Sequence, residues 1–326
     1  MAHSDDRPRT LVIVNPAAGG GAAARAEPRV ASYLRRREVP ADFVRSRSGD
    51  DVRRLAAEAA SRGYTRVAVL GGDGTFHQAV SAALSEGVAG HLEFAFLPAG
   101  NGNDIARGFG IPEDALEAAR LLGVSPPKGT THRFDALRVQ AAKGGERYYF
   151  GAGGMGLDAE AAQLVNRRFR GWPGTLRYIA AAFAAYRSFQ PVELEAAFDA
   201  VKWQGRVLLA AVANVPCYGA GIGIAPAAVP DDGWLDVTLV EPLPLGRLVE
   251  ALPGIVRREA RHPDWPEITH HRARRVSLAV AKNASSSSRT PRAALFHGDG
   301  ELLGESPLEV EVAPAAVRVV TPEKIR

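Results

Sequence analysis

The chain has 326 residues, which suggests two domains at roughly 100–200 residues each. Hydrophobic residues make up 46% of it and charged residues 23%, an ordinary globular balance, and the formal net charge is +4. The single cysteine, Cys217, excludes a disulfide framework and a cysteine-based metal site, and it fits a reducing cytoplasm.

Strands and helices alternate over the first 130 residues. The run TLVIVNP at 10–16 is continuously apolar, which predicts a strand buried on both faces, and a glycine loop at 17–21 and a helix to about residue 37 follow it. Further strands are expected at 41–48, 66–70 and 93–98, and further helices at 50–63, 75–86 and 113–123, with Asp50 as a cap of the first of these helices. This alternation predicts a parallel sheet wrapped by helices.

The pattern changes after about residue 130. Strand-like runs at 131–140, 145–153, 191–200, 205–216, 234–242 and 274–281 predict a mainly antiparallel second domain. Helical segments at 158–188 and 245–260 interrupt these runs, a surface loop is expected at 283–292, and the last strand covers 315–322.

Three of the predicted parallel strands end in polar, glycine-rich loops. These are NPAAGGG at 15–21, LGGDGT at 70–75 and LPAGNGNDIARGFGIP at 97–112. Since parallel strands present their carboxyl ends at one edge of the sheet, the loops predict a nucleotide or phosphate pocket there. Asp73 would then hold Mg²⁺ or cap a backbone N–H group, while purely structural turns are the alternative. Neither the dinucleotide fingerprint nor the Walker pattern is satisfied.

These three segments, together with GDGE at 298–301, occur in the order typical of the diacylglycerol kinase catalytic-domain family, which the chain resembles from about residue 11 to residue 322. That family includes soluble bacterial lipid kinases and the sphingosine and ceramide kinases. The resemblance implies a Rossmann-like parallel α/β domain at 1–130 and a mainly antiparallel β-sandwich at 131–312 that binds the lipid. A C-terminal strand at 313–326 would return to the first domain.

The resemblance also implies a set of ATP-binding residues on the glycine-rich loops. The family usually has threonine where this chain has Asn101, and Ser46 is the hydroxyl nearest to the threonine that usually follows the second strand. The implied nucleotide-binding residues are Asn15, Pro16, Gly19, Ser46, Gly71, Gly72, Asp73, Gly74, Thr75, Asn101, Asn103 and Asp104.

The family's proton acceptor lies in the Asp-Gly-Glu string, which makes Glu301 the first candidate here and Asp299 the second. Phosphoryl transfer to a hydroxyl needs such a carboxylate, and it needs Mg²⁺ to neutralise the phosphates. The alternative for this string is an Asp-Gly hairpin turn. The resemblance also implies a structural Mg²⁺ site at 229–237, held by the carboxylate of Asp232 and the carbonyls of Val229 and Trp234. The alternative for this segment is a second Asp-Gly hairpin.

The function implied is that of a lipid kinase that uses ATP and Mg²⁺, with diacylglycerol as the expected substrate and phosphatidic acid as the product. A kinase of a soluble substrate such as NAD, and a nucleotide-binding regulator without catalysis, are the alternatives. We expect a cytoplasmic protein that meets its lipid at the membrane surface. The Arg- and aromatic-rich segment 165–189 is a candidate for contact with an anionic membrane, and the slightly favoured alternative for it is a helical cover over the cleft with ordinary solvated arginines. It would bind no nucleic acid and could form a homodimer.

Overall fold

The structure, a computed structural model, describes residues 8–123, 129–142, 145–157, 160–161, 164, 180–181, 183–187, 189–250, 265–281 and 294–323. Most of the helix expected at 158–188, most of the helix expected at 245–260, the loop expected at 283–292 and most of the Arg- and aromatic-rich segment 165–189 lie outside the described residues. The chain divides into two units. The first comprises Met1–Phe134 and Ala315–Arg326, and the second comprises Asp135–Pro314.

The first unit is built on a parallel sheet whose strands run in the order β2-β1-β3-β4, with the C-terminal part of β18 beside β4. The residues of β1 are all buried, as are all but the first residues of β3 and β4. Strands that are covered on both faces have unbroken apolar sequences, and for this reason they could be predicted from the sequence. The strands are β1 Thr10–Val14, β2 Ala41–Arg45, β3 Arg66–Gly71, β4 Glu93–Pro98 and β18 Leu308–Pro322.

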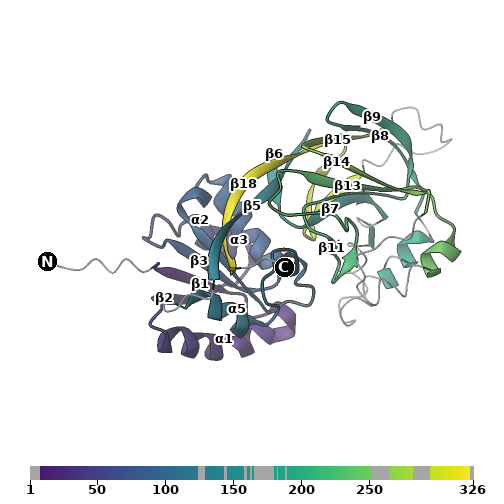
Figure 1. Cartoon of the computed structure of the whole chain (residues 1–326). Helices are drawn as coiled ribbons and strands as arrows, with labels where there is room; N and C mark the ends of the chain where they lie inside the picture. The colour runs from purple at the N-terminus through teal and green to yellow at the C-terminus, as the bar shows by residue number, and fades with distance from the viewer. Residues whose placement is uncertain are drawn as a thin grey trace. The chain divides into compact units, whose positions relative to one another are not determined.

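Helices cover both faces of this sheet. Within the first unit, α2 and α3 lie on one face and α1 and α5 lie on the other (Figure 1). The helices are α1 Ala18–Arg36, α2 Gly49–Ala57, α3 Asp73–Ser85, α4 Asp104–Gly108 and α5 Ala115–Ala119, with short 3₁₀ helices η1 Ala89–His91 and η2 Arg120–Leu122. Within the bounds of α1, the glycines at 19–21 have positive φ and form the loop after β1 rather than regular helix.

Several helix boundaries differ from the predicted ones. The cap of α2 is the Ser48 hydroxyl, which accepts a hydrogen bond from Asp51 N at 3.2 Å, so the prediction of Asp50 as the cap is wrong. Asp50 lies in the first turn and pairs with Arg53 instead. α2 ends at Ala57, and α4 was not predicted because five residues carry too little periodicity.

The second unit is built mainly of antiparallel strands in two large sheets, and β11 and β12 form a further two-stranded sheet. One sheet has the order β14-β13-β10-β7-β16-β17, and the other contains β15, β8 and β9 beside the first part of β18, together with β5 and β6. The strands are β5 Gly129–Ala141, β6 Gly145–Tyr149, β7 Ala152–Gly156, β8 Val192–Phe198, β9 Val201–Val207, β10 Leu209–Ala213, β11 Cys217–Tyr218, β12 Ile222–Gly223, β13 Leu235–Val240, β14 Ile268–Ala273, β15 Arg275–Val280, β16 Leu295–Gly298 and β17 Glu301–Glu305.

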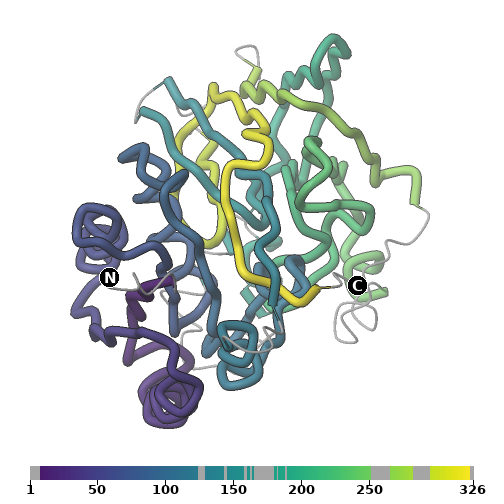
Figure 2. Tube along the Cα trace, turned by 60° about the vertical axis from the view of Figure 1, so that its left-hand side comes forward, coloured from purple at the N-terminus to yellow at the C-terminus, as the bar shows by residue number. Residues whose placement is uncertain are grey.

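A common apolar core joins these two sheets into a sandwich. It includes Leu137, Tyr149, Leu194, Leu235 and Phe296, which come from both sheets and are fully buried. The fold class predicted from the sequence, a parallel α/β domain followed by a mainly antiparallel β-sandwich, is therefore confirmed. The long strand β18 contributes to both units, and its course can be followed in yellow in Figure 2. No helix in the described part of the chain has the length and apolar character needed to cross a bilayer.

A charged cluster links three strands on the surface of the sandwich. Glu311 on β18 accepts hydrogen bonds from Arg138 on β5 and, at 3.1 Å, from Arg275 on β15. The hydrogen bond from Arg138, and then that from Arg275, lowers the pKa of Glu311 below its ordinary value of 4.5. Glu311 therefore stabilises the fold above pH 4.5, and this contribution is lost as the pH falls through the lowered pKa of the folded state.

We expect Glu311→Gln to lower the urea midpoint of unfolding at pH 7 and to have less effect near pH 3. The loss should be small, because both arginine side chains are more than one third exposed. Glu309→Gln is the matched control, since Glu309 on the same strand pairs with Arg275 alone, and it should lose less at pH 7. Equal differences between parent and Glu311→Gln at both pH values would contradict this account.

Candidate active site

The three glycine-rich loops of the first unit begin at the same level of its sheet. Val14 at the end of β1 lies opposite Leu70, and Leu70 and Gly71 at the end of β3 lie opposite Leu97 and Pro98. The loops that follow these strands therefore leave the sheet side by side at its carboxyl edge. The prediction that these three segments meet at one edge is confirmed.

The loops are in direct backbone contact, and glycine makes that contact possible. A Cβ atom on Gly19 would lie 2.1 Å from the carbonyl oxygen of Ala99, and one on Gly100 would lie 2.7 Å from the Cα atom of Gly72. A side chain on Gly71 would lie 2.9 Å from that of Thr75, whereas Gly74 has nothing within 4 Å. The glycines at 19 and 100 therefore allow the loops to approach one another closely, in addition to any room that they leave for a ligand.

Asn15 and Thr75 come together across two of the loops. The side-chain nitrogen of Asn15 donates to the Thr75 hydroxyl at 2.9 Å, and its oxygen accepts from Ala17 N at 3.2 Å. Pro16 lies inside this short turn. The contact fixes the Thr75 hydroxyl at the start of α3, whose N-cap residue, Gly72, has no side chain. First-turn N–H groups of such a helix attract anions such as phosphate.

Asp73 caps a helix, which is one of the two roles the sequence left open for it. Its carboxylate oxygens accept from Ile105 N at 3.1 Å and from Asp104 N at 3.2 Å, at the beginning of α4. The Asp104 carboxylate is itself paired with Arg107 at 2.7 Å. Among the described residues, no group of three acidic, histidine or cysteine side chains is arranged to hold a metal ion.

The remaining predicted residues of the first unit lie at the same edge in different settings. Asn103 has a left-handed backbone, with φ of 56°, and its side-chain oxygen accepts from Gly100 N at 3.2 Å, which closes the loop. Asn101 is exposed on that loop. Ser46 follows β2 and is buried, and its hydroxyl donates to the carbonyl of Val14 at 3.2 Å.

In the second unit, Asp299 and Gly300 form the turn between β16 and β17, both with positive φ (52° and 85°). The string is thus a hairpin turn, and that turn also orients a carboxylate. Its two oxygens accept from Phe150 N at 2.8 Å and Gly151 N at 2.9 Å. Asp299 is therefore immobilised by backbone amides that lie almost 150 residues earlier in the chain.

Glu301 begins β17 just after this turn and is half-buried. Burial lowers the pKa of the neighbouring His297, and the charge of Glu301 acts in the opposite direction. His297 was not predicted as a site residue, although it stands two residues before Asp299 in the string HGDGE. The His297 imidazole therefore lies within the electrostatic influence of Glu301.

The proposed structural Mg²⁺ site at 229–237 contains an arginine. Asp232 accepts from Trp234 N at 3.0 Å and from the guanidinium of Arg272 on β14. Arg272 also lies 3.7 Å from Asp236. Burial raises the pKa of Asp236, and the charge of Arg272 acts to lower it. As arranged here, the Asp232 carboxylate does not fit a divalent cation, because a side-chain cation already pairs with it.

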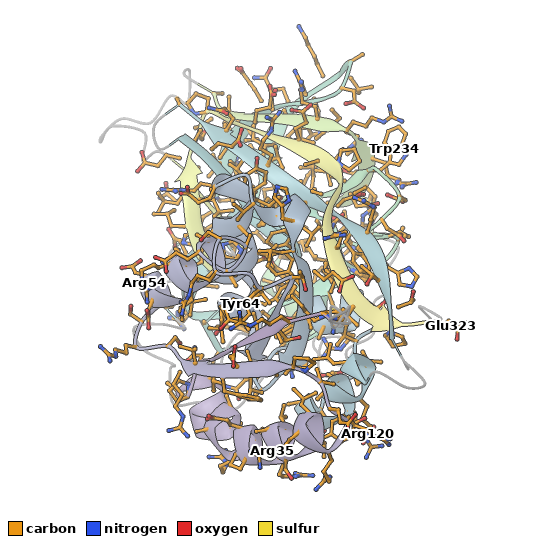
Figure 3. All side chains as sticks on the ribbon, turned by 90° about the vertical axis from the view of Figure 1, so that its left-hand side faces the viewer. Arg35, Arg54, Tyr64, Arg120, Trp234 and Glu323 are labelled. Carbon is orange, nitrogen blue, oxygen red and sulfur yellow. The ribbon has the colours of Figure 1, made fainter. Side chains whose placement is uncertain are left out.

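Trp234, labelled in Figure 3, completes this cluster, while Val229 is exposed on the same turn. The guanidinium groups of Arg272 and Arg274 lie over the Trp234 ring, 5.5 Å and 4.9 Å from its centre. Nothing in the spacing of VPDDGWLDV revealed Arg272, because it comes from a strand 40 residues later that pairs with β13.

We expect Arg272→Ala to create a response to Mg²⁺ that the parent lacks. Removal of the guanidinium leaves Asp232 and Asp236 without their cation, so a bound Mg²⁺ should stabilise the variant by about 1.4 kcal/mol at ten times its dissociation constant. Thermal unfolding with and without Mg²⁺ measures this. Arg274→Ala is the control, since Arg274 stacks on the same tryptophan. An equal Mg²⁺ response in the parent would show that the arginine does not replace the ion.

Taken together, these observations define a two-unit protein in which three glycine-rich loops lie side by side at the carboxyl edge of a parallel sheet. Residues 9–139 match the diacylglycerol kinase catalytic domain, and residues 129–321 match the YegS C-terminal NAD kinase beta sandwich-like domain. A diacylglycerol kinase of Mycobacterium tuberculosis is 30% identical over 318 residues, which cover 96% of this chain and 95% of that protein.

Two further comparisons agree. A Pseudomonas putida protein named "Probable lipid kinase YegS-like" is 27% identical over 279 residues, which cover 83% of this chain and 82% of the relative. The crystal structure of a diacylglycerol kinase from Bacillus anthracis has the same fold, with a TM-score of 0.71 at 16% identity over 98% of this chain and 99% of the other. The chain belongs to the diacylglycerol kinase catalytic-domain family of lipid kinases.

Proposed function

We propose that the protein transfers the γ-phosphoryl group of ATP to the free hydroxyl of diacylglycerol, which yields phosphatidic acid. The observation that carries this proposal is the direct contact of the three glycine-rich strand ends in a chain of this family. They combine the N-terminus of α3, which follows the glycine Gly72, with the Thr75 hydroxyl and the Asn15 amide at one sheet edge. Such groups bind phosphate oxygens.

In this proposal the loops of the first unit bind ATP, which arrives as its Mg²⁺ complex. Asp73 and Asp104 act on the protein side by holding the loop at 99–104 against the start of α3. Phosphoryl transfer depends mainly on positioning and on neutralisation of charge, and the glycine loops would supply the first of these.

A carboxylate of the second unit would take the proton from the lipid hydroxyl. The new bond forms between that oxygen and the γ-phosphorus, while the bond from the γ-phosphorus to the β–γ bridging oxygen breaks and ADP leaves with that oxygen. We favour Asp299 over Glu301 as the acceptor because two amides hold its carboxylate in one orientation. An oriented base loses less freedom on reaching the transition state.

Labelled phosphate transfer from ATP tests the proposal. The full chain is incubated with Mg²⁺, [γ-³²P]ATP and mixed micelles that contain diacylglycerol, a sphingoid base or no lipid, and in a separate arm with NAD. Label in phosphatidic acid is the expected result. Label in NAD alone would make the protein a kinase of a soluble substrate, and nucleotide binding without transfer to any acceptor would make it a regulator.

A further inference from the structure

Asn214 is a buried amide that lies directly after β10 in the second unit. Its side chain is fully buried, with 0% of the residue exposed, between Ala213 and Val215 of the apolar core. Burial of an amide is unfavourable unless hydrogen bonds replace those to water. The role of Asn214 can therefore be read from the groups that it binds.

Those groups belong to the segment that holds Asp299. The Asn214 side-chain nitrogen donates to the carbonyl oxygen of Phe150 and to that of Asp135, both at 3.2 Å, and its backbone N–H donates to the carbonyl of Gly151 at 2.8 Å. The N–H groups of the same Phe150 and Gly151 donate to the Asp299 carboxylate. Asn214 and Asp299 thus bind the same two residues: Asn214 binds their carbonyl groups, and Asp299 binds their N–H groups.

Phe150 and Gly151 need such support because they lie at a break between strands. β6 ends at Tyr149 and β7 begins at Ala152, so these two residues belong to neither strand. Backbone groups outside a ladder keep one orientation only if side chains or water bind them. Asn214 and Asp299 supply those partners, and the Asp299 N–H adds a bond to the carbonyl of Ala152 at 3.1 Å.

The surrounding packing leaves little freedom for this arrangement. A Cβ atom on Gly153 of β7 would lie 2.5 Å from the carbonyl oxygen of His297, and one on Gly298 would lie 2.8 Å from the Tyr149 ring. β16 and β7 are therefore held close together just before the Asp299 turn. A shift of the 150–151 backbone would be transmitted to the carboxylate that it binds.

The side-chain oxygen of Asn214 is buried and has no hydrogen-bond partner in the described part of the chain. An unsatisfied buried acceptor is destabilising, so stability alone does not account for an amide here. What the amide provides is a donor that binds the carbonyl of Phe150 and that of Asp135 at once.

We infer that Asn214 is a positioning residue for the phosphoryl transfer. It fixes the peptide units of Phe150 and Gly151, whose amides orient the Asp299 carboxylate toward the proton that it accepts. This inference rests on the proposed function, because it assigns Asn214 a role through the proposed base. Asn214 itself touches neither ATP nor lipid in this account.

The test replaces Asn214 with leucine, which has a similar size and cannot donate a hydrogen bond. Misplacement of a catalytic group by about 1 Å can lower rates by about 10²-fold, so we expect kcat to fall by about 10–100-fold. The KM for ATP should stay unchanged, because the ATP-binding loops belong to the first unit. Thr238→Val is the control, since the buried Thr238 hydroxyl donates at 2.6 Å to Ile224 and does not contact the 150–151 segment. It should lower stability and leave kcat unchanged.

A double-mutant cycle with Asp299→Asn separates positioning from general damage. If Asn214 acts through Asp299, Asn214→Leu lowers kcat in the parent and hardly at all in the Asp299→Asn background. The inference would be overturned if Asn214→Leu lowered kcat by the same factor in the parent and in the Asp299→Asn background. It would also be overturned if Asn214→Leu lowered kcat no more than Thr238→Val does. If the leucine variant does not fold, Asn214→Ala, which also removes the side-chain donor, carries the same cycle. A parent without any lipid kinase activity would instead refute the proposed function.

Discussion

Replacement of Asp299 by asparagine is expected to lower the turnover number for lipid phosphorylation by roughly 10²–10⁴-fold. Asparagine tolerates the left-handed backbone at this position, where φ is 52°, and it can still accept a hydrogen bond from one of the two amides. The turn between β16 and β17 should therefore persist. What is lost is the negative charge and the capacity to accept a proton.

Initial rates at saturating ATP and diacylglycerol measure this effect, and thermal unfolding establishes that the variant is folded. The KM for ATP should change little, because Asp299 belongs to the second unit and acts on the acceptor hydroxyl. Glu301→Gln is the comparison, two residues away at the start of β17. A larger loss in Glu301→Gln would exchange the roles of the two carboxylates, and parental turnover in both variants would exclude either as the base.

A second large effect is expected from alanine at Gly19. Its Cβ atom would lie 2.1 Å from the carbonyl oxygen of Ala99, a distance that two non-bonded atoms cannot adopt. The loops after β1 and β4 would have to separate, and both carry proposed ATP-binding residues. We expect the affinity for ATP to fall at least tenfold, which is about 1.4 kcal/mol.

Gly20→Ala is the matched control for this substitution. Gly19 and Gly20 have nearly the same backbone conformation, with φ of 58° and 60°, so alanine pays a similar penalty of about 1–2 kcal/mol at either position. Nothing lies within 4 Å of a Cβ atom at Gly20. Calorimetric titration with the Mg²⁺ complex of ATP and thermal unfolding should therefore separate the two variants. Equal affinities would mean that loop contact is irrelevant to nucleotide binding.

The sequence predicted the first unit well because its strands are buried on both faces. β4 was predicted with its observed bounds, and β1 and β3 within two residues at each end. The helix after β3 begins at Asp73 rather than near Thr75, because its N-cap residue, Gly72, has no side chain that would mark the boundary in the sequence.

Features that depend on partners distant in the chain were not predicted. α4 is five residues long, and its N-terminus is capped by Asp73, which lies 31 residues before it. The polar strand β14 was not predicted, because the partners of its arginine, Asp232 and Asp236, lie about 40 residues earlier. The role of Asn214 depends on residues 64 and 79 positions away, which no local pattern reveals.

Attempts to dissect the chain must respect the course of β18. The parallel sheet gains its strand beside β4 only when the last part of the polypeptide comes back, as the pairing of Val319 with Phe94 shows. A truncated product that stopped at residue 134 would expose the backbone of β4 along a sheet edge, which promotes aggregation. A fragment of the first unit made for expression would therefore need residues 315–323 joined to it, for example by a short linker or by circular permutation.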